Sequence, residues 1–124
     1  MIIPPIIVVE SFDIVIYPSV EAAEASLEAV DVHDGIYAVY DSAGHLLKLF
    51  TEKMVGENKF LFLKWHTAYE RVVIHENPVV EDHMAELRAS LIASLTYWNK
   101  EKAAGLVDMP FDQLFSIAIK RYMY

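Results

Sequence analysis

The sequence predicts an α+β fold with one antiparallel sheet. Segments rich in β-branched and aromatic residues, separated by turn signals, fill most of residues 6–75. From residue 80 onward the apolar residues recur at the 3.6-residue period of a helix. We expect the order β-α-β-β-β-β-α-α, with four to five strands and the helices packed on one face of the sheet. The 124 residues suffice for a single domain, 1–124, with one core.

The first elements are predicted at residues 6–17 and 19–30. Residues 6–17 (IIVVESFDIVIY) read as one long strand or two short strands. Pro18 ends the strand region, and Ser19 is a suitable N-cap for a helix that runs to about Val30. Acidic residues on this helix would lie within roughly 80° of one another, beside an apolar stripe that is buried. This acidic stripe consists of Glu21, Glu24, Glu28 and Asp31.

A β-hairpin is the clearest local signal. Residues 35–41 and 45–53 flank Asp41-Ser42-Ala43-Gly44, where Asp at the first position and Gly at the last suit a type I turn. A second turn is expected at Gly56-Glu57-Asn58, leading to a strand over 59–65.

The last expected strand covers residues 68–75, after a break near His66-Thr67. Asn77-Pro78 should end the sheet region, because proline disfavours continuing the ladder.

Two helices are predicted in the last third. The first runs from about Val80 to Ala104 and ends at Gly105. The second begins after Asp108 and Pro110. The first helix should bury a continuous stripe of Val80, Met84, Leu87, Leu91, Leu95 and Trp98. The second should bury Phe111, Leu114, Phe115, Ala118, Ile119 and Tyr122.

The negative charge is confined to the first third of the chain. The first basic residue is Lys48, and eight acidic residues precede it. From there onward ten acidic and ten basic residues cancel, so the formal charge of -8 belongs to residues 1–47. Such a field repels nucleic-acid phosphates and anionic lipid and attracts a cationic surface. We therefore expect a cationic protein partner, and neither a nucleic acid nor a membrane.

No motif for catalysis or cofactor binding is present. The chain has no cysteine, no metal-binding histidine spacing and only four dispersed glycines. We expect no enzymatic activity, no cofactor and no metal site. The apolar runs are too short to span a membrane, and no signal peptide is recognisable. A cytoplasmic location is therefore expected.

Two segments resemble small immunity proteins of bacterial polymorphic toxin systems. They are DIVIYPSVEAAEASLEAVDVHDGIYAVYDSAGHLLKL (13–49) and EDHMAELRASLIASL (81–95), which together cover about half of the chain. The similar features are the strand, the Pro-Ser entry to an acidic helix, the hairpin and the late amphipathic helix. The resemblance implies a non-enzymatic protein that neutralises a cognate toxin, frequently a basic nuclease or a nucleotide-modifying enzyme.

The charge pattern supplies the predicted partner-binding residues. They are Glu21, Glu24, Glu28, Asp31, Asp34, Tyr37 and Asp41. The alternative hypothesis is a small enzyme or ligand-binding domain with a pocket between sheet and helices, using His33, Asp34 or His75. A homodimer that buries surplus apolar surface is compatible with both hypotheses.

Overall fold

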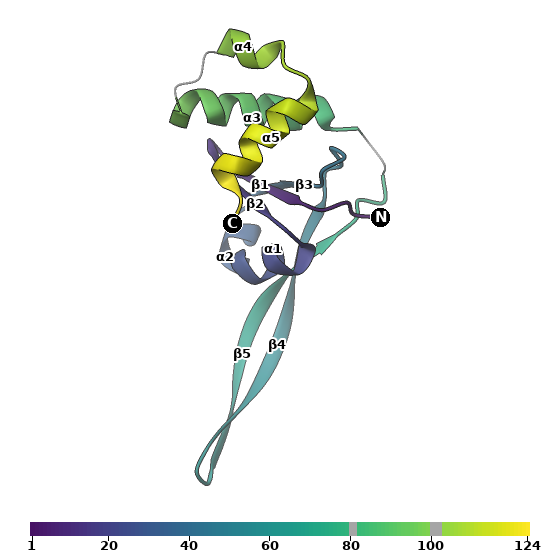
Figure 1. Ribbon diagram of the computed structural model, residues 1–124. Helices are drawn as coiled ribbons and strands as arrows, with labels where there is room; N and C mark the ends of the chain where they lie inside the picture. Colours follow the sequence, from purple (N-terminus) through teal and green to yellow (C-terminus); the bar gives the residue numbers. More distant parts are fainter. Residues whose placement is uncertain (80–81, 100–102) are drawn as a thin grey trace.

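The computed structural model describes residues 1–79, 82–99 and 103–124, and it confirms the α+β class. Within these ranges the chain forms two antiparallel sheets and five helices. Figure 1 shows a body in which helices lie above and below a small sheet, and a slender two-stranded arm that projects from the body.

The sheet in the body has three strands. They are β1 (Ile6–Glu10), β2 (Asp13–Tyr17) and β3 (Ala38–Tyr40), in the order β2-β1-β3. Residues 6–17 thus form two short strands, one of the two alternatives that the sequence left open. Ser11 begins the two-residue turn between them with φ at +56°.

Both faces of this sheet are covered. Ile7 and Val9 point into a core under α3 (Met84–Asn99) and α5 (Phe111–Tyr122). Ile6 and Val8 point to the opposite side, into a second core that includes α1 (Val20–Ser26). The expected packing of helices on one face therefore differs from the structure. The reason is that four consecutive apolar residues of β1 make both of its faces apolar, and both must be buried.

The predicted N-terminal helix is divided into two. Ser19 caps α1 as expected, because its Oγ accepts a hydrogen bond from Ala22 N at 3.1 Å. The helix ends at Leu27, whose backbone is extended and whose side chain is buried in the second core. Glu28 is also extended, and α2 (Ala29–His33) then begins in a new direction. A straight helix to Val30 is thus wrong, because the bend keeps Leu27 in the core while α2 packs against the arm.

The turn at residues 41–44 forms, but the hairpin around it is short. Gly44 N donates to Asp41 O at 3.2 Å, and Asp41 N donates to His45 O at 3.1 Å. Leu47 N then donates to Val39 O at 2.8 Å. Beyond this point the two segments separate, since β3 pairs with β1 and the following strand pairs elsewhere.

The arm consists of β4 (Lys48–Phe60) and β5 (Leu63–His75), two strands of 13 residues. Their ladder is continuous from the pair Lys48–His75 to the pair Phe60–Leu63. The turn expected at residues 56–58 and the break expected near 66–67 are therefore wrong. Gly56 pairs with Thr67 without a positive φ, so glycine here is an ordinary strand residue.

The first of the two predicted C-terminal helices, α3, begins at Met84. Leu87, Leu91 and Leu95 are fully buried, as the stripe on α3 requires. Met84 is half-buried, Trp98 is exposed, and the predicted start at Val80 lies outside the described residues.

Asp82 precedes α3, and its Oδ1 atom accepts a hydrogen bond from Met84 N at 2.8 Å, which marks the helix start.

The predicted helix end at Gly105 is wrong. Gly105 lies inside a separate short helix, α4 (Ala103–Val107). The last helix, α5, follows Pro110 as expected and buries Leu114 and Ala118.

Replacing Leu91 by alanine should reduce the free energy of unfolding by about 2–5 kcal/mol, because the change leaves a void in a fully buried site. Ala93 lies on the exposed side of the same helix, so Ala93→Gln should change stability by less than about 0.5 kcal/mol. Urea denaturation of both variants makes the comparison. A loss below about 1 kcal/mol for Leu91→Ala would contradict the packing of α3.

Replacing Gly44 by alanine should also destabilise the fold, by roughly 2–4 kcal/mol. Gly44 has φ at +83°, and a Cβ there would lie 2.9 Å from the Met84 Cα atom. Gly105 is the matched control, since a Cβ there meets nothing within 4 Å and the helix favours alanine. Thermal unfolding should show opposite signs for the two variants, and equal effects would rule out the contact between the turn and α3.

Candidate partner-binding surface

The structure places the predicted partner-binding residues in different environments. Six of them come from α1, α2 and the segment that follows, and the seventh belongs to the turn at residues 41–44. Glu21, Glu28 and Asp34 are exposed. Glu24, Asp31 and Tyr37 are half-buried, and Asp41 is fully buried. The acidic stripe is therefore not one helical face, because the bend at Leu27 separates its two halves.

Among the described residues, the three exposed carboxylates have no counter-ion. In the part of the chain that the structure describes, the side chains of Glu21, Glu28 and Asp34 form neither an ion pair nor a hydrogen bond. They lie on elements whose apolar side is fixed in the core through Ala23 and Leu27. The result is a set of free negative charges on a rigid support, which is the arrangement that long-range attraction of a cationic partner requires.

Glu24 has a structural role that the sequence did not reveal. Its Oε2 atom accepts a hydrogen bond from Ile74 N, on the outer edge of β5, at 2.8 Å. This bond occupies a backbone donor at a strand edge, where an unpaired N–H group could otherwise form a hydrogen bond with a strand of another molecule. Glu24 therefore fastens α1 to the base of the arm.

A second attachment joins α2 to the arm. His33 Nε2 lies 2.8 Å from Glu70 Oε2 of β5. The hydrogen bond from His33 lowers the pKa of the Glu70 carboxyl, and Thr51 contributes in the same direction. These contacts hold the acidic helices against one side of the arm, close to its base.

Tyr37 and Asp31 form a half-buried pair beside these helices. The Tyr37 hydroxyl donates to Asp31 Oδ2 at 3.0 Å. Burial raises the pKa of Tyr37 to about 12, and the hydrogen bond and negative charge of Asp31 add to this effect. Part of the Tyr37 ring is accessible, so the pair offers a contact that is both apolar and acidic at the edge of the surface.

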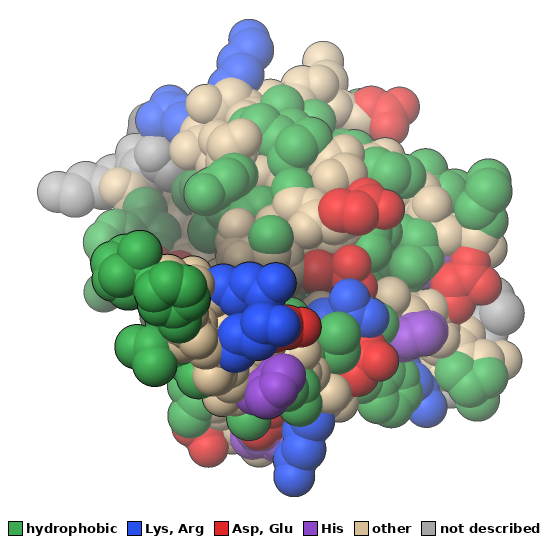
Figure 2. Space-filling model, turned by 90° about the horizontal axis from the view of Figure 1, so that it is seen from below, with side chains coloured by type: hydrophobic (Ala, Val, Ile, Leu, Met, Phe, Trp, Pro, Cys, Tyr) green, Lys and Arg blue, Asp and Glu red, His purple; other side chains and the backbone are tan. Residues whose placement is uncertain are grey.

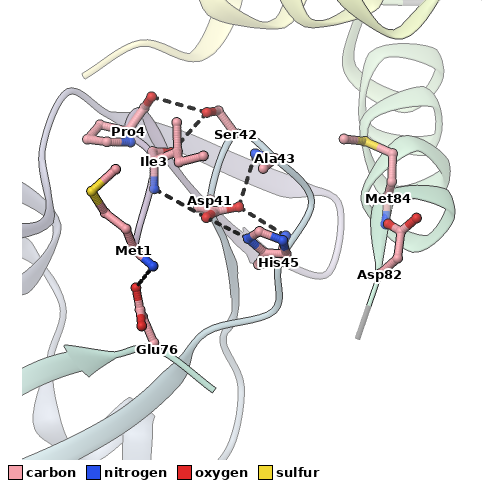
Figure 3. Close-up of polar contacts among 10 residues, drawn as sticks. All are labelled: Met1, Ile3, Pro4, Asp41, Ser42, Ala43, His45, Glu76, Asp82 and Met84. Carbon is pink, nitrogen blue, oxygen red and sulfur yellow. Dashed lines mark hydrogen bonds and ion pairs between the residues drawn. The ribbon is translucent and has the colours of Figure 1, made fainter. Parts of the chain in front are cut away.

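Asp41 must be removed from the predicted binding residues, because its carboxylate is wholly inside the protein. Its oxygens accept hydrogen bonds from the backbone N–H groups of Ile3, Ala43 and His45, at 3.0 to 3.2 Å. The Nδ1 atom of His45 lies 3.1 Å from Oδ2. Figure 3 shows how Asp41 joins the N-terminal segment to the turn. Its negative charge is fully engaged in holding these two segments together.

The pocket beside Asp41 does not contain the residues of the alternative hypothesis. It has a volume of about 200 Å³ and lies between the turn, the N-terminal segment and the end of β5, with His45 and Glu76 in its wall. His33 instead contacts Glu70, whereas the His75 ring packs edge-on against Phe50. Glu70 and His75 are five residues apart on β5, a separation of about 17 Å.

His33, Asp34 and His75 therefore do not meet in one site. Across the described ranges, no three His, Asp or Glu side chains are grouped so that they could hold a metal ion.

The arm is a surface feature that the sequence interpretation missed. Its tip consists of Phe60, Leu61, Phe62 and Leu63, which are 65%, 84%, 100% and 67% exposed. Figure 2, which faces the arm end of the molecule, shows hydrophobic side chains gathered at one side with basic side chains next to them. The available signal was the run Phe-Leu-Phe-Leu between Lys59 and Lys64, which contains no polar turn residue.

Replacing Asp31 by asparagine should lower the pKa of Tyr37 from about 12 without restoring its ordinary value, because burial persists. Absorbance titration of the phenolates measures this change. Tyr40 also has a pKa of about 12, so Tyr37→Phe serves to identify which late ionisation belongs to Tyr37. An unchanged titration in Asp31→Asn would contradict the contact.

The raised pKa of Tyr37 also predicts a loss of stability in alkali. The folded protein binds this proton more tightly than the unfolded chain, whose tyrosines have the ordinary pKa of 10.0. The stabilisation is therefore complete below pH 10 and is lost as the pH rises toward 12. Tyr37→Phe should show a smaller loss over this interval when unfolding by urea is measured at each pH.

No protein-family model, no curated protein and no solved structure matches this chain. Among the described residues, no helix is long and apolar enough to cross a membrane.

Proposed function

We propose that this chain is a non-enzymatic immunity protein that binds and neutralises a cognate, basic toxin domain. The observation that carries the proposal is the set of exposed carboxylates on α1 and at the two ends of α2, which have no counter-ion within the described residues. They lie in a stretch of 47 residues without a single Lys or Arg. The resemblance to immunity proteins supports the identity of the partner, and the absence of cysteine fits action in the cytoplasm.

Free carboxylates on a rigid support would act mainly on the rate of association. Opposite charges steer two proteins together before contact, whereas the final affinity depends on well-packed groups at the centre of the interface. Glu21, Glu28 and Asp34 would provide the steering. The partly accessible ring of Tyr37 would contribute to the packed centre. Neutralisation would follow because the bound protein covers the cationic surface on which a toxin of this kind holds its substrate.

Growth rescue tests the function directly. The candidate toxin to test is the product of a gene adjacent to the one that encodes this chain, expressed from an inducible promoter in a sensitive bacterium. Co-expression of this chain should restore growth, and the two purified proteins should form a stable complex. If the chain neither rescues growth nor binds that product, the proposed function is wrong.

Neutralising three exposed acids should slow association with the toxin by roughly tenfold at low salt, and by less at physiological ionic strength, because salt screens exposed charges. The variant carries Glu21→Gln, Glu28→Gln and Asp34→Asn, and leaves the structural Glu24 and Asp41 unchanged.

The matched control carries the same change of net charge at exposed acids elsewhere on the body, through Asp13→Asn, Asp108→Asn and Asp112→Asn. Association rates from stopped-flow fluorescence should be close to wild type for this control. Equal rates for both triple variants would show that the acidic surface of α1 and α2 does not face the toxin.

A further inference from the structure

Most of the arm is not packed against any other described part of the chain. Residues 61–70 are all exposed, and only its base reaches the second core, through Leu49, Val72 and Ile74. A two-stranded ribbon is at best marginally stable in water without a third strand or a packed face. The outer half of the arm therefore needs a surface to cover it.

The arm has two different faces, because residues paired directly across an antiparallel ladder share a face. We call one the apolar face, because it carries the large apolar and aromatic side chains Phe50, Met54, Phe60, Leu63, Trp65 and Tyr69. The polar side chains of Lys48, Glu52, Asn58, Thr67, Arg71 and His75 lie between them on the same face. We call the other the charged face, which presents Lys53, Glu57, Lys59, Lys64, His66 and Glu70. α1 and α2 pack on the charged-face side, through Val72, Ile74 and Glu70. The apolar face is left open.

The turn at the tip also indicates a contact surface. Leu61 has φ at +56°, a conformation that a two-residue hairpin turn normally assigns to glycine or asparagine. A leucine costs on the order of 1 kcal/mol there. The Leu61 side chain lies between two exposed phenylalanines and makes no favourable interaction with water. It can therefore offset this cost only by contact with another apolar surface.

We propose that the apolar face binds the same face of a second copy of this chain, with the two arms antiparallel about a two-fold axis. Charge determines this arrangement. Residues 48–75 contain five basic and three acidic residues, so the arm has a formal charge of +2. The rest of the chain has a formal charge of -10, which gives the total of -8. Parallel arms would bring two acidic bodies together. Antiparallel arms place them at opposite ends of a ribbon about 44 Å long, several times the screening length of about 8 Å.

The apolar face is complementary to itself in this orientation. The tip pair Phe60–Leu63 of one copy lies over the base pair Phe50–Val73 of the other. A shallow hollow is present at that base, on the same face, and Phe50, His75 and Pro78 contribute to its lining. The tip of each copy thus has a binding site at the base of the other copy. Because the arrangement has two-fold symmetry, the dimer contains two equivalent contacts of this kind.

The same register predicts two further contacts on this face. Trp65 lies over Arg71 of the second copy, which allows a cation–π contact, and Arg71 keeps its ion pair with Glu52 at 2.7 Å. Gly56 of one copy lies next to the centre of the interface, over the pair of Met54 and Tyr69 of the second copy. A residue without a side chain at this position lets two ribbons approach closely.

The contact area predicts a weak dimer. Eleven cross-strand pairs extend over about 37 Å, and a two-stranded ribbon about 10 Å wide then contributes roughly 400 Å² per copy. Stable interfaces bury about 800 Å² per partner, so an interface of about half this size is expected to be weak, with a dissociation constant on the order of tens of micromolar. The acidic surface of α1 and α2 stays free, since it lies on the charged-face side. The inference is therefore independent of the proposed toxin binding.

Sedimentation equilibrium of the full chain tests the dimer, from about 1 µM to 1 mM, a range centred on the expected affinity. The wild type should convert from monomer to dimer within this range. Phe60→Gln with Leu63→Gln, on the apolar face, should weaken the dimer at least tenfold. The control, Lys59→Gln with Lys64→Gln, introduces the same side chain at the neighbouring pair of the charged face and should dimerise like the wild type. A wild type that remains monomeric throughout, or equal effects of the two double variants, would overturn the proposal.

Cysteine cross-linking tests the orientation, since the chain has no cysteine of its own. Within one chain, Phe62 and His75 lie at opposite ends of the arm. Phe62→Cys with His75→Cys should give a disulfide-linked dimer under a mild oxidant, because antiparallel packing brings the tip of one copy to the base of the other. Neither single variant should do so. Cross-linking of Phe62→Cys alone would indicate parallel arms and refute this arrangement, whereas growth rescue from the toxin would be unaffected in either case.

Discussion

The burial of both faces of β1 is the constraint on which the rest of the fold depends. Residues Ile6–Val9 are four consecutive apolar side chains, and all of them are inside the protein. A strand of this kind is stable only between two apolar layers. The C-terminal helices supply one layer, and α1 with the base of the arm supplies the other. The arm is therefore anchored by the same requirement that holds the helices on the sheet.

Local signals in the sequence were sufficient where a few neighbouring residues determine the conformation. Ser19 before an amphipathic segment marks a helix start, and Asp41 with Gly44 marks a tight turn. The spacing of Leu87, Leu91 and Leu95 identifies a buried helical face. Each of these interpretations uses information within one or two turns of the chain, and the structure confirms all of them.

Features that depend on distant contacts were not predictable in the same way. Gly56-Glu57-Asn58 has the composition of a turn, yet its backbone is held in a ladder by residues 65–67. The bend at Leu27 exists because the core requires its side chain. In the sequence Asp41 resembles an ordinary exposed turn aspartate, because the N–H group of Ile3 that it binds lies 38 residues away.

The exposure of Glu21 and Asp34, by contrast, followed from their charge alone, since an unpaired carboxylate is costly to bury.

The alternation of side chains along the arm has a consequence for evolution. Odd-numbered positions of β4 face α1, α2 and the solvent on the charged side, and even-numbered positions lie on the apolar side. The two sets are thus subject to different selection, although they alternate within a single segment. In chains descended from a common ancestor, substitutions along residues 48–60 should therefore show a period of two. Phe50, Met54 and Phe60 would exchange one apolar side chain for another, while Lys53, Glu57 and Lys59 would exchange one charged side chain for another.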